Sequence, residues 1–323
     1  MIAKKRGVVD GSSTISHIAW NTFFGLPKKN CLSASRVVFQ LGFFLRNLHF
    51  AIYILPWALY NIGNFSAKEK PMLNFILKRA VPIPKLTNFN SFLFVGPHPD
   101  DIEVACGGTV AKLTKLGKKV RFLVATNGCV GSLDESLTSD QIVQTRRQEA
   151  LKSAHLLGVD DVVFLSHNDG NDYDLEAMKR DVVACILDFQ PQVVFCPDYT
   201  VPSECHPDHV NVGKVATESV FVATWQKLTS RLGLQGSCPA PVLAYYYTHK
   251  PNCYVGVGKT YKLQRQAMAC HVSQFDQETL NSFNTYFSAR EICFGMRCFK
   301  RRAEGFRVLA PVHQHCFPEA SNW

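Results

Sequence analysis

The sequence lacks the cysteine spacings that mark a disulfide-rich domain or a structural zinc module. Its twelve cysteines are scattered, and none of them forms a CxxC pair. Several lie in apolar runs, such as Cys196, which is typical of buried free thiols in a reducing compartment. A chain of 323 residues can also bury a substantial core without disulfides or a structural metal. We therefore expect a cytoplasmic protein in which a cluster of metal ligands is not needed for folding.

The sequence also lacks a secretory signal and an apolar run long enough to cross a bilayer. The basic residues near the start are followed by polar residues rather than by an apolar segment. An apolar, aromatic stretch occupies residues 37–63, but Arg46 and His49 interrupt it, and Pro56 would kink or end a helix there. Neither half reaches the roughly 20 apolar residues that a span needs. Two interpretations stay open, an in-plane contact with the inner face of a membrane and packing on protein.

Acidic residues are nearly absent from the first 88 positions. This segment holds twelve Lys or Arg and two acids, whereas the other 235 residues hold 23 basic and 24 acidic groups. The net charge of +9 therefore belongs to the N-terminal part. A nucleic-acid-binding domain would carry its basic patch on folded helices or strands, so the distribution argues against nucleic acid as a partner. Basic flanks on both sides of the aromatic stretch instead favour peripheral contact with an anionic membrane surface.

The chain shows no internal repeat and no low-complexity tract, and it divides into two parts. Pro71, Pro82 and Pro84 punctuate a basic connector, which places a boundary near residue 88. We expect residues 1–88 to form a basic, aromatic-rich helical extension and residues 89–323 to form the main domain.

Short apolar strands alternate with longer helices from residue 89 onward. We expect strands at 92–95, 120–125, 162–165 and 193–196, and helices at 101–116, 139–158 and 175–189. Thr138 and Gln141 have the spacing of a capping box, which would begin the second of these helices at residue 139. This alternation predicts parallel βαβ units and hence an α/β fold, a three-layer α/β/α sandwich with a mostly parallel sheet. Ligands bind beyond the carboxyl ends of the strands in such sheets.

Two proline-punctuated clusters of histidine and aspartate follow two of these strands. Pro97-His98-Pro99-Asp100-Asp101 comes directly after the first strand, and His206-Pro207-Asp208-His209 lies in the loop after the fourth. His98, Asp101 and His209 together offer two imidazoles and a carboxylate. Three such ligands with an open position are the pattern of a catalytic zinc site, although other divalent metals such as Fe²⁺ stay open.

The remaining polar groups of the two clusters suit the hydrolysis of an amide. Asp100, next to Asp101, can act as general base toward a water molecule that the metal activates. His206 can protonate the leaving amine or stabilise the oxyanion, and Asp208 can orient its ring. A single His-Pro-Asp is often an ordinary turn, but two such motifs at strand ends are much harder to obtain by chance.

Further short motifs accompany the two clusters between residues 90 and about 310. They are Val95–Glu103 followed by Cys106–Thr109, Arg146–Ala150, Asp169-Gly170, His271–Gln274 and Arg302–Arg307. Together with the two clusters, they resemble the signature of the PIG-L or LmbE-type deacetylases. The resemblance implies a Rossmann-like, LmbE-like fold and the metal, base and oxyanion roles given above. It also implies that Arg146 and Asp169 contact a sugar, although the residues alone fit a helix-surface ion pair and a turn equally well.

The resemblance implies a zinc-dependent hydrolase that removes an N-acetyl group from an N-acetylglucosamine-type conjugate. Two alternatives stay open, an amidase of the same fold acting on another acylated amine and a non-catalytic sugar- or lipid-binding protein. A homo-oligomer also stays open. We expect specificity to lie in the loops at 127–140 and 248–258.

Three other features are interpreted without a function. We expect Tyr245–Tyr247 to form a core strand, Lys300–Arg302 to lie on a solvated helix face, and His313 with His315 to belong to a solvated tail.

Overall fold

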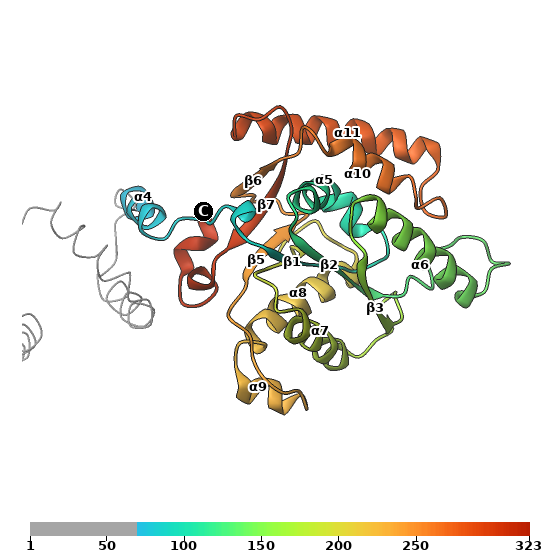
Figure 1. Cartoon of the computed structure of the whole chain (residues 1–323), viewed down its shortest axis with the longest axis horizontal. Coiled ribbons are helices and arrows are strands. Elements are labelled where there is room, and N and C mark those ends of the chain that lie inside the picture. The colour runs from blue at the N-terminus through green and yellow to red at the C-terminus, as the bar shows by residue number, and fades with distance from the viewer. Residues whose placement is uncertain (1–69) are drawn as a thin grey trace, which may run out of the picture. The chain divides into compact units, whose positions relative to one another are not determined.

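The structure is a computed structural model that describes residues 70–323 (Figure 1). The aromatic stretch at 37–63 and its expected membrane contact lie outside the described residues, as does most of the predicted extension. Within the described part, no helix has both the length and the hydropathy that crossing a membrane requires.

Helices and strands alternate along most of the described chain. The strands are β1 (Ser91–Gly96), β2 (Lys119–Thr126), β3 (Asp161–His167), β4 (Val193–Pro197), β5 (Val242–Tyr246), β6 (Cys253–Gly256) and β7 (Ala303–Leu309). The helices are α4 (Lys70–Ala80), α5 (Asp101–Lys115), α6 (Ser139–Leu156), α7 (Leu175–Phe189), α8 (Pro207–Val222), α9 (Gln226–Arg231), α10 (Tyr261–Met268) and α11 (Gln277–Arg297). Short 3-10 turns occupy Leu86–Asn88, Pro311–His313 and Pro318–Asn322.

The strands form one seven-stranded sheet in the order β3-β2-β1-β4-β5-β7-β6. Strands β1 to β5 pair in parallel, and β7 and β6 complete one side as antiparallel strands. The predicted α/β sandwich with a mostly parallel sheet is therefore confirmed. The chain runs outward from β1 to β2 and β3 and then returns to β4 on the other side of β1. This reversal makes β1 and β4 neighbours, and ligands bind at such a switch point in open α/β sheets.

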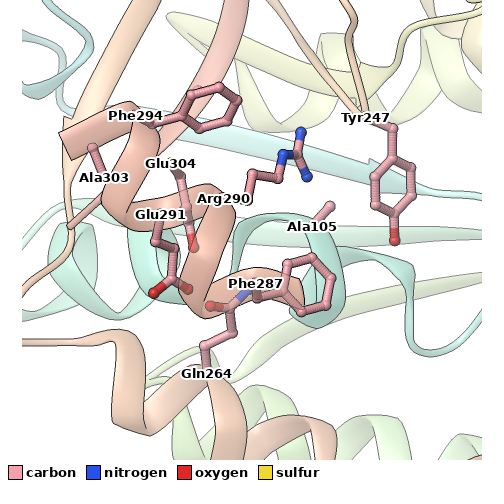
Figure 2. A pocket seen from close by; sticks show the side chains of 10 residues that line it. Ala105, Tyr247, Gln264, Phe287, Arg290, Glu291, Phe294, Ala303 and Glu304 are labelled. Atoms are coloured by element: carbon pink, nitrogen blue, oxygen red, sulfur yellow. The ribbon is translucent and has the colours of Figure 1, made fainter. Parts of the chain in front are cut away.

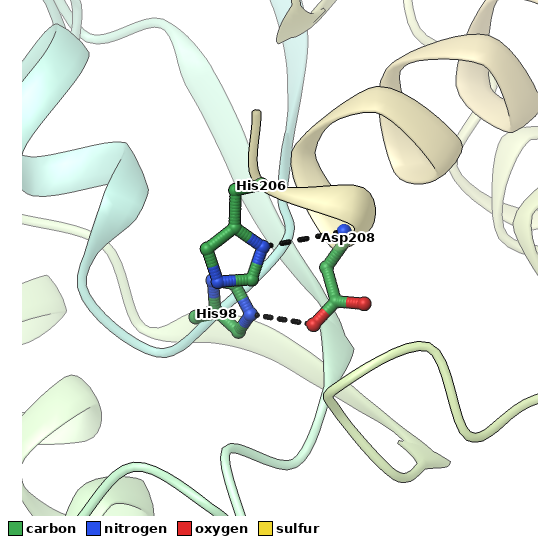
Figure 3. Close-up of side chains that lie close together, drawn as sticks. All are labelled: His98, His206 and Asp208. Atoms are coloured by element: carbon green, nitrogen blue, oxygen red, sulfur yellow. Dashed lines mark hydrogen bonds and ion pairs between the residues drawn. The ribbon is translucent and has the colours of Figure 1, made fainter. Parts of the chain in front are cut away.

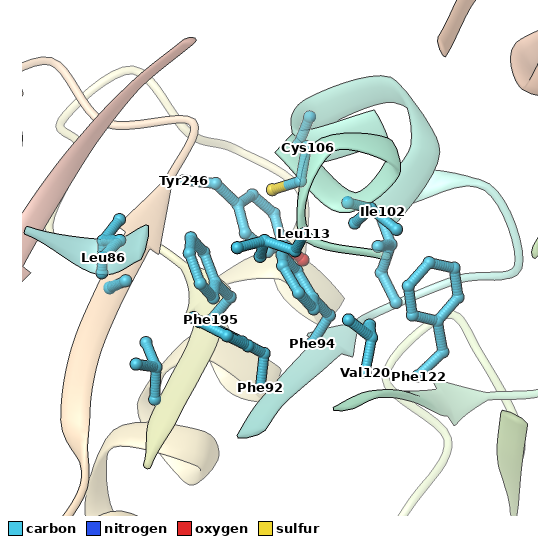
Figure 4. Close-up of a cluster of buried hydrophobic side chains, with 14 of the residues drawn as sticks. Leu86, Phe92, Phe94, Ile102, Cys106, Leu113, Val120, Phe122, Phe195 and Tyr246 are labelled. Atoms are coloured by element: carbon cyan, nitrogen blue, oxygen red, sulfur yellow. The ribbon is translucent and has the colours of Figure 1, made fainter. Parts of the chain in front are cut away.

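Successive side chains of β1 point to opposite faces of the sheet and so contribute to two separate parts of the core. Phe92 and Phe94 point to the face that α5 and α10 cover, whereas Leu93 and Val95 point to the face that α7 and α8 cover. The two helix layers lie on opposite sides of the sheet (Figure 1). On the first face, the ring of Phe94 stacks on that of Phe195 at 4.3 Å (Figure 4). Burying each of these phenylalanines stabilises the fold by about 1.5–3 kcal/mol.

The start of α6 follows the predicted capping box. The Thr138 side chain accepts a hydrogen bond from the Gln141 backbone N–H, and the Gln141 side chain accepts one from the Thr138 N–H at 2.8 Å. These reciprocal bonds satisfy two N–H groups that a helix start otherwise leaves unpaired. The capping box therefore forms as the sequence predicts.

Gly108 in α5 allows a close approach of β7. Both oxygens of Glu304 accept backbone N–H groups of α5, Oε1 from Gly108 at 2.9 Å and Oε2 from Thr109 at 2.8 Å. A Cβ at Gly108 would lie 2.6 Å from Glu304 Oε1. Burial raises the pKa of Glu304 to about 7. Gly108 thus serves packing between α5 and β7, whereas a Cβ at Gly107 would lie 2.8 Å from the Gln264 side chain on α10.

Two expectations for the C-terminal part are wrong. His313 is buried rather than solvated: its Nε2 lies 3.0 Å from the carbonyl oxygen of Val81, and its ring contacts that of Trp323, whereas His315 is exposed. Lys300–Arg302 lies in the turn between α11 and β7 rather than on a helix. Arg302 binds the buried Glu291 at 2.9 Å, so this segment is anchored to α11.

Candidate functional site

The two predicted clusters meet at the carboxyl ends of β1 and β4. Asp101 lies between two imidazoles, with its Oδ2 3.2 Å from His98 Nδ1 and its Oδ1 3.3 Å from His209 Nε2. One ligand atom from each of these three residues lies within 4.8 Å of the others. The structure therefore brings together the three residues that the sequence predicts as metal ligands.

The carboxylate of Asp208 orients His98 rather than His206. Its Oδ2 lies 3.0 Å from His98 Nε2 (Figure 3) and accepts the Gly170 N–H at 2.8 Å. Its Oδ1 accepts the Asn171 N–H at 2.8 Å and the Tyr173 hydroxyl at 2.9 Å. Burial alone would raise the pKa of Asp208, but the hydrogen bonds from His98, Gly170 and Tyr173 hold it well below its usual range.

His206 caps α8 and contacts Asp208 only through the main chain. Its Nδ1 accepts the Asp208 backbone N–H at 3.3 Å (Figure 3). The prediction that the Asp208 carboxylate orients this ring is therefore wrong, because at the start of a helix that side chain points toward the loop at 170–173. Burial and the neighbouring His98 and His209 lower the pKa of His206. A neutral His206 whose Nδ1 accepts a hydrogen bond carries its proton on Nε2 and can donate it.

Asp100 lies beside the metal-ligand candidates and is held by an arginine. Its Oδ2 forms an ion pair with Arg146 Nη2 at 3.2 Å. Burial and the negative charge of Asp101 raise the pKa of Asp100, and Arg146 opposes that shift. Arg146 is 4% exposed and also donates to the Gly128 carbonyl at 3.2 Å. It is a buried partner of Asp100 rather than a residue of the helix surface.

Asp169 shapes the loop that follows β2. Its Oδ1 accepts the Val130 N–H at 3.0 Å, and the Cys129 thiol lies 3.0 Å from the same oxygen. Both Asp169 and Arg146 line the cavity described next, so the structure brings them to the site. Their predicted contact with a sugar stays a prediction.

A cavity of about 360 Å³ opens onto the cluster. Its polar lining is His98, Asp100, Asp101, Arg146, Asp169, His206, His209 and Gln274, and its other lining residues are Val104, Val130, Gly131, Tyr247, Phe275 and Phe283. This volume lies in the lower part of the roughly 300–1,000 Å³ range of small-molecule sites. A second cavity, beneath α11 and lined by Tyr247, Arg290 and Glu304 (Figure 2), measures about 10 Å³ and holds at most a water molecule.

Tyr247 belongs to the site, although its sequence context suggests a core strand. Strand β5 ends at Tyr246, and Tyr247 adopts a positive φ of 55°. This conformation is rare for a bulky residue and is found where the surroundings enforce it. It places the ring parallel to that of His209 at 5.9 Å, with the hydroxyl 3.5 Å from Asp101 Oδ1.

A buried polar network behind Asp100 was also missed. Glu103 accepts a short hydrogen bond from Ser153, and His271 Nε2 lies 3.2 Å from the same Ser153 oxygen. Nearby, Glu149 accepts both the backbone N–H and the hydroxyl of Ser273. These bonds join the Arg146–Ala150 and His271–Gln274 motifs. The motifs were visible in the sequence, but their pairing requires the fold.

Comparison with known proteins identifies the group to which this arrangement belongs. Residues 93–220 match the sequence profile of PIG-L, described as GlcNAc-PI de-N-acetylase. The chain is 30% identical over 230 residues to the diacetylchitobiose deacetylase of Thermococcus kodakarensis, which covers 71% of this chain and 86% of that protein. The chain belongs to the PIG-L family.

Two further relatives of this PIG-L family protein bear on its fold and site. The N,N'-diacetylchitobiose deacetylase from Pyrococcus horikoshii, complexed with its inhibitor MPG, superposes with a TM-score of 0.71 at 29% identity. That match covers 80% of this chain and 98% of the other. A 1D-myo-inositol 2-acetamido-2-deoxy-alpha-D-glucopyranoside deacetylase from Kineococcus radiotolerans is 25% identical over 52% of this chain and 54% of its own length.

Proposed function

We propose that this PIG-L family protein is a zinc-dependent hydrolase that removes the N-acetyl group from an N-acetylglucosamine-type conjugate. The observation that carries the proposal is the arrangement of His98, Asp101 and His209 beside Asp100 at one end of a cavity. The names of the relatives support the substrate class, because diacetylchitobiose and the inositol-linked sugar both carry an acetamido group on a sugar.

The residues present fit a zinc ion. Two imidazole nitrogens and one carboxylate converge, and each imidazole has a carboxylate on its other nitrogen, Asp208 for His98 and Glu204 for His209. That outer contact is usual for histidines that bind a metal. Fe²⁺ accepts the same donors. A bound metal would supply Lewis-acid polarisation of the amide carbonyl and of water.

The side chains around this cluster can perform the proton transfers of amide hydrolysis. Asp100, which lines the cavity beside the ligand candidates, takes the proton from the attacking water. Arg146 holds Asp100 in place during this step. His206 donates a hydrogen bond from Nε2 to the oxyanion. The C–N bond then breaks, the amine receives a proton from Asp100, and acetate and the free amine leave.

The proposal is tested by measuring acetate release from a substrate panel. Metal-free full-length protein is reconstituted with zinc and assayed on N-acetylglucosamine, diacetylchitobiose, and the inositol-linked, lipid-linked and nucleotide-linked sugars. We expect acetate release from at least one conjugate, lost on chelation and restored by zinc. A protein that binds one zinc per chain and releases no acetate from any member would refute it.

We also propose contact of residues 1–88 with an anionic membrane surface. What supports this proposal is the charge distribution of the sequence, and a liposome assay for it is given below.

A further inference from the structure

Glu204 connects the two histidines of the second cluster. It lies in the loop between β4 and α8, and its backbone N–H donates to the Val201 carbonyl at 3.1 Å. Its Oε1 accepts the His206 backbone N–H at 2.8 Å. Its Oε2 lies 3.2 Å from His209 Nδ1. The carboxylate therefore contacts the ring of His209 on the side that faces away from Asp101.

The chemistry of the two groups assigns the proton on His209. A neutral imidazole has one N–H donor and one lone pair, and a carboxylate only accepts. Because Glu204 accepts a proton from Nδ1, Nε2 is the nitrogen whose lone pair can be given to a metal. That nitrogen is the one 3.3 Å from Asp101 Oδ1, inside the cluster of ligand candidates.

His98 shows the same arrangement with its nitrogens exchanged. Its Nε2 faces Asp208, and its Nδ1 faces Asp101 Oδ2. Each imidazole thus has one carboxylate outside the cluster and shares Asp101 inside it. The two outer carboxylates come from the segment at 204–208, so one short stretch of chain sets the lone pairs of both rings.

Ring stacking alone does not set the tautomer of His209. Its ring lies between those of His206, at 4.8 Å and 19°, and Tyr247, at 5.9 Å and 10°. These contacts fix the plane of the ring but not the positions of its two nitrogens. Rotating the ring by 180° about the Cβ–Cγ bond would keep both stacking contacts. The orientation is selected by the hydrogen bond that Nδ1 donates to Glu204 on one side and by the contact of Nε2 with Asp101 on the other.

We propose that Glu204 is a positioning residue that holds His209 with Nδ1 protonated and Nε2 facing Asp101, and thereby sets the affinity of the site for zinc. This inference rests on the metal site of the proposed function. Partners of metal-binding histidines typically change metal affinity by 10- to 100-fold when they are removed.

The test compares Glu204→Ala and Glu204→Gln with the wild type in the full-length chain. Zinc affinity is measured by competition with a fluorescent chelator on metal-free protein. We expect a 10- to 100-fold weaker affinity for Glu204→Ala and an intermediate affinity for Glu204→Gln, whose one amide oxygen can accept from His209 Nδ1 or from the His206 N–H but not from both. Glu218→Ala is the matched control, because Glu218 on α8 pairs with Lys179 at 2.8 Å and does not line the cavity. Its zinc affinity should equal that of the wild type.

Nitrogen-detected NMR of the His209 ring gives a second readout that needs neither zinc nor substrate. In metal-free protein we expect a proton on Nδ1 in the wild type, because Glu204 accepts it. In Glu204→Ala the neutral ring should shift toward a proton on Nε2, because Asp101 is then the carboxylate that accepts. Unchanged zinc affinity together with an unchanged tautomer in Glu204→Ala would overturn the inference. A wild type that binds zinc and hydrolyses nothing would contradict the proposed function alone.

Discussion

Replacing Asp208 with asparagine changes one atom of a carboxylate that accepts four hydrogen bonds. Each oxygen accepts two of these bonds. Oδ2 accepts from His98 Nε2 and the Gly170 N–H, and Oδ1 accepts from the Asn171 N–H and the Tyr173 hydroxyl. An asparagine amide has one oxygen and one NH₂ group. In either orientation, the NH₂ group therefore faces a backbone N–H that it cannot satisfy.

The magnitude follows from these contacts. One buried N–H without an acceptor costs about 1–3 kcal/mol, and weakening the remaining bonds from charged to neutral costs about 1 kcal/mol more. We expect Asp208→Asn to lower the free energy of unfolding by about 2–4 kcal/mol and the melting temperature by about 10 °C, since 1 kcal/mol shifts a domain of this size by about 2–4 °C. Zinc affinity should fall as well, because His98 Nε2 then faces a neutral amide oxygen or an NH₂ group in place of a carboxylate oxygen.

The pH dependence of this effect has a defined sign. Hydrogen bonds hold the native pKa of Asp208 below its ordinary value of about 4, despite burial. The stability that the carboxylate contributes is therefore fully present above that ordinary pKa and is lost as the pH falls toward the native pKa. The difference between wild type and Asp208→Asn should shrink on acidification.

The assay is urea unfolding of metal-free protein at pH 7 and at lower pH values. Asp181→Asn is the matched control, because Asp181 on α7 also contacts a histidine, His167, at 3.1 Å but is half-exposed. An exposed pair of this kind contributes about 0–1 kcal/mol. If Asp208→Asn were as stable as Asp181→Asn, the four hydrogen bonds would not carry the energy assigned to them.

Three other outcomes follow from the site, the fold and the extension. Asp100→Asn should lower kcat for deacetylation by about 10²- to 10⁴-fold while bound zinc, measured by elemental analysis, stays at the wild-type level; full activity would remove Asp100 from the role of base. Gly108→Ala should destabilise the protein by about 1–3 kcal/mol in urea unfolding, because the new Cβ would meet Glu304 Oε1 at 2.6 Å, whereas Ser282→Ala on the exposed side of α11 should change stability little. If Gly108→Ala were as stable as the wild type, β7 would be able to move away from α5 at no cost in stability. The intact chain should sediment with anionic liposomes at low salt, and deletion of residues 1–63 should release it; an intact chain that stays in the supernatant would contradict membrane contact.

The first half of the main domain was predictable because β1, β2 and β4 are largely buried on both faces, and the partly buried edge strand β3 is also apolar. Such strands read as short apolar runs, and residues 92–95, 120–125, 162–165 and 193–196 each lie within an observed strand. The antiparallel strand β7 was not predicted, because Glu304 and Arg307 interrupt its apolar pattern. Glu304 is tolerated there only because α5 supplies two N–H groups, a contact that no local pattern reveals.

The members of the candidate site were predictable from spacing, but their partners were not. Three residues converge because two strands end side by side, which the alternation of strands and helices implies. The partner of Asp208 depends on the direction of a side chain in the first turn of α8 and on the course of the loop at 170–173. The position of the Tyr247 ring in the site depends on its positive φ, which a run of three tyrosines does not predict.

Because the site lies between the neighbouring strands β1 and β4, it can form only at a late stage of synthesis and folding. His98 and Asp208 are 110 residues apart in sequence. Contacts of such long range form late in folding, because the loop between them must close first. During synthesis, the segment carrying His98 and Asp101 emerges before its partner and offers only part of a metal site. On the proposed function, metal uptake follows formation of the sheet, and we expect that a chain cut between β3 and β4 does not retain zinc.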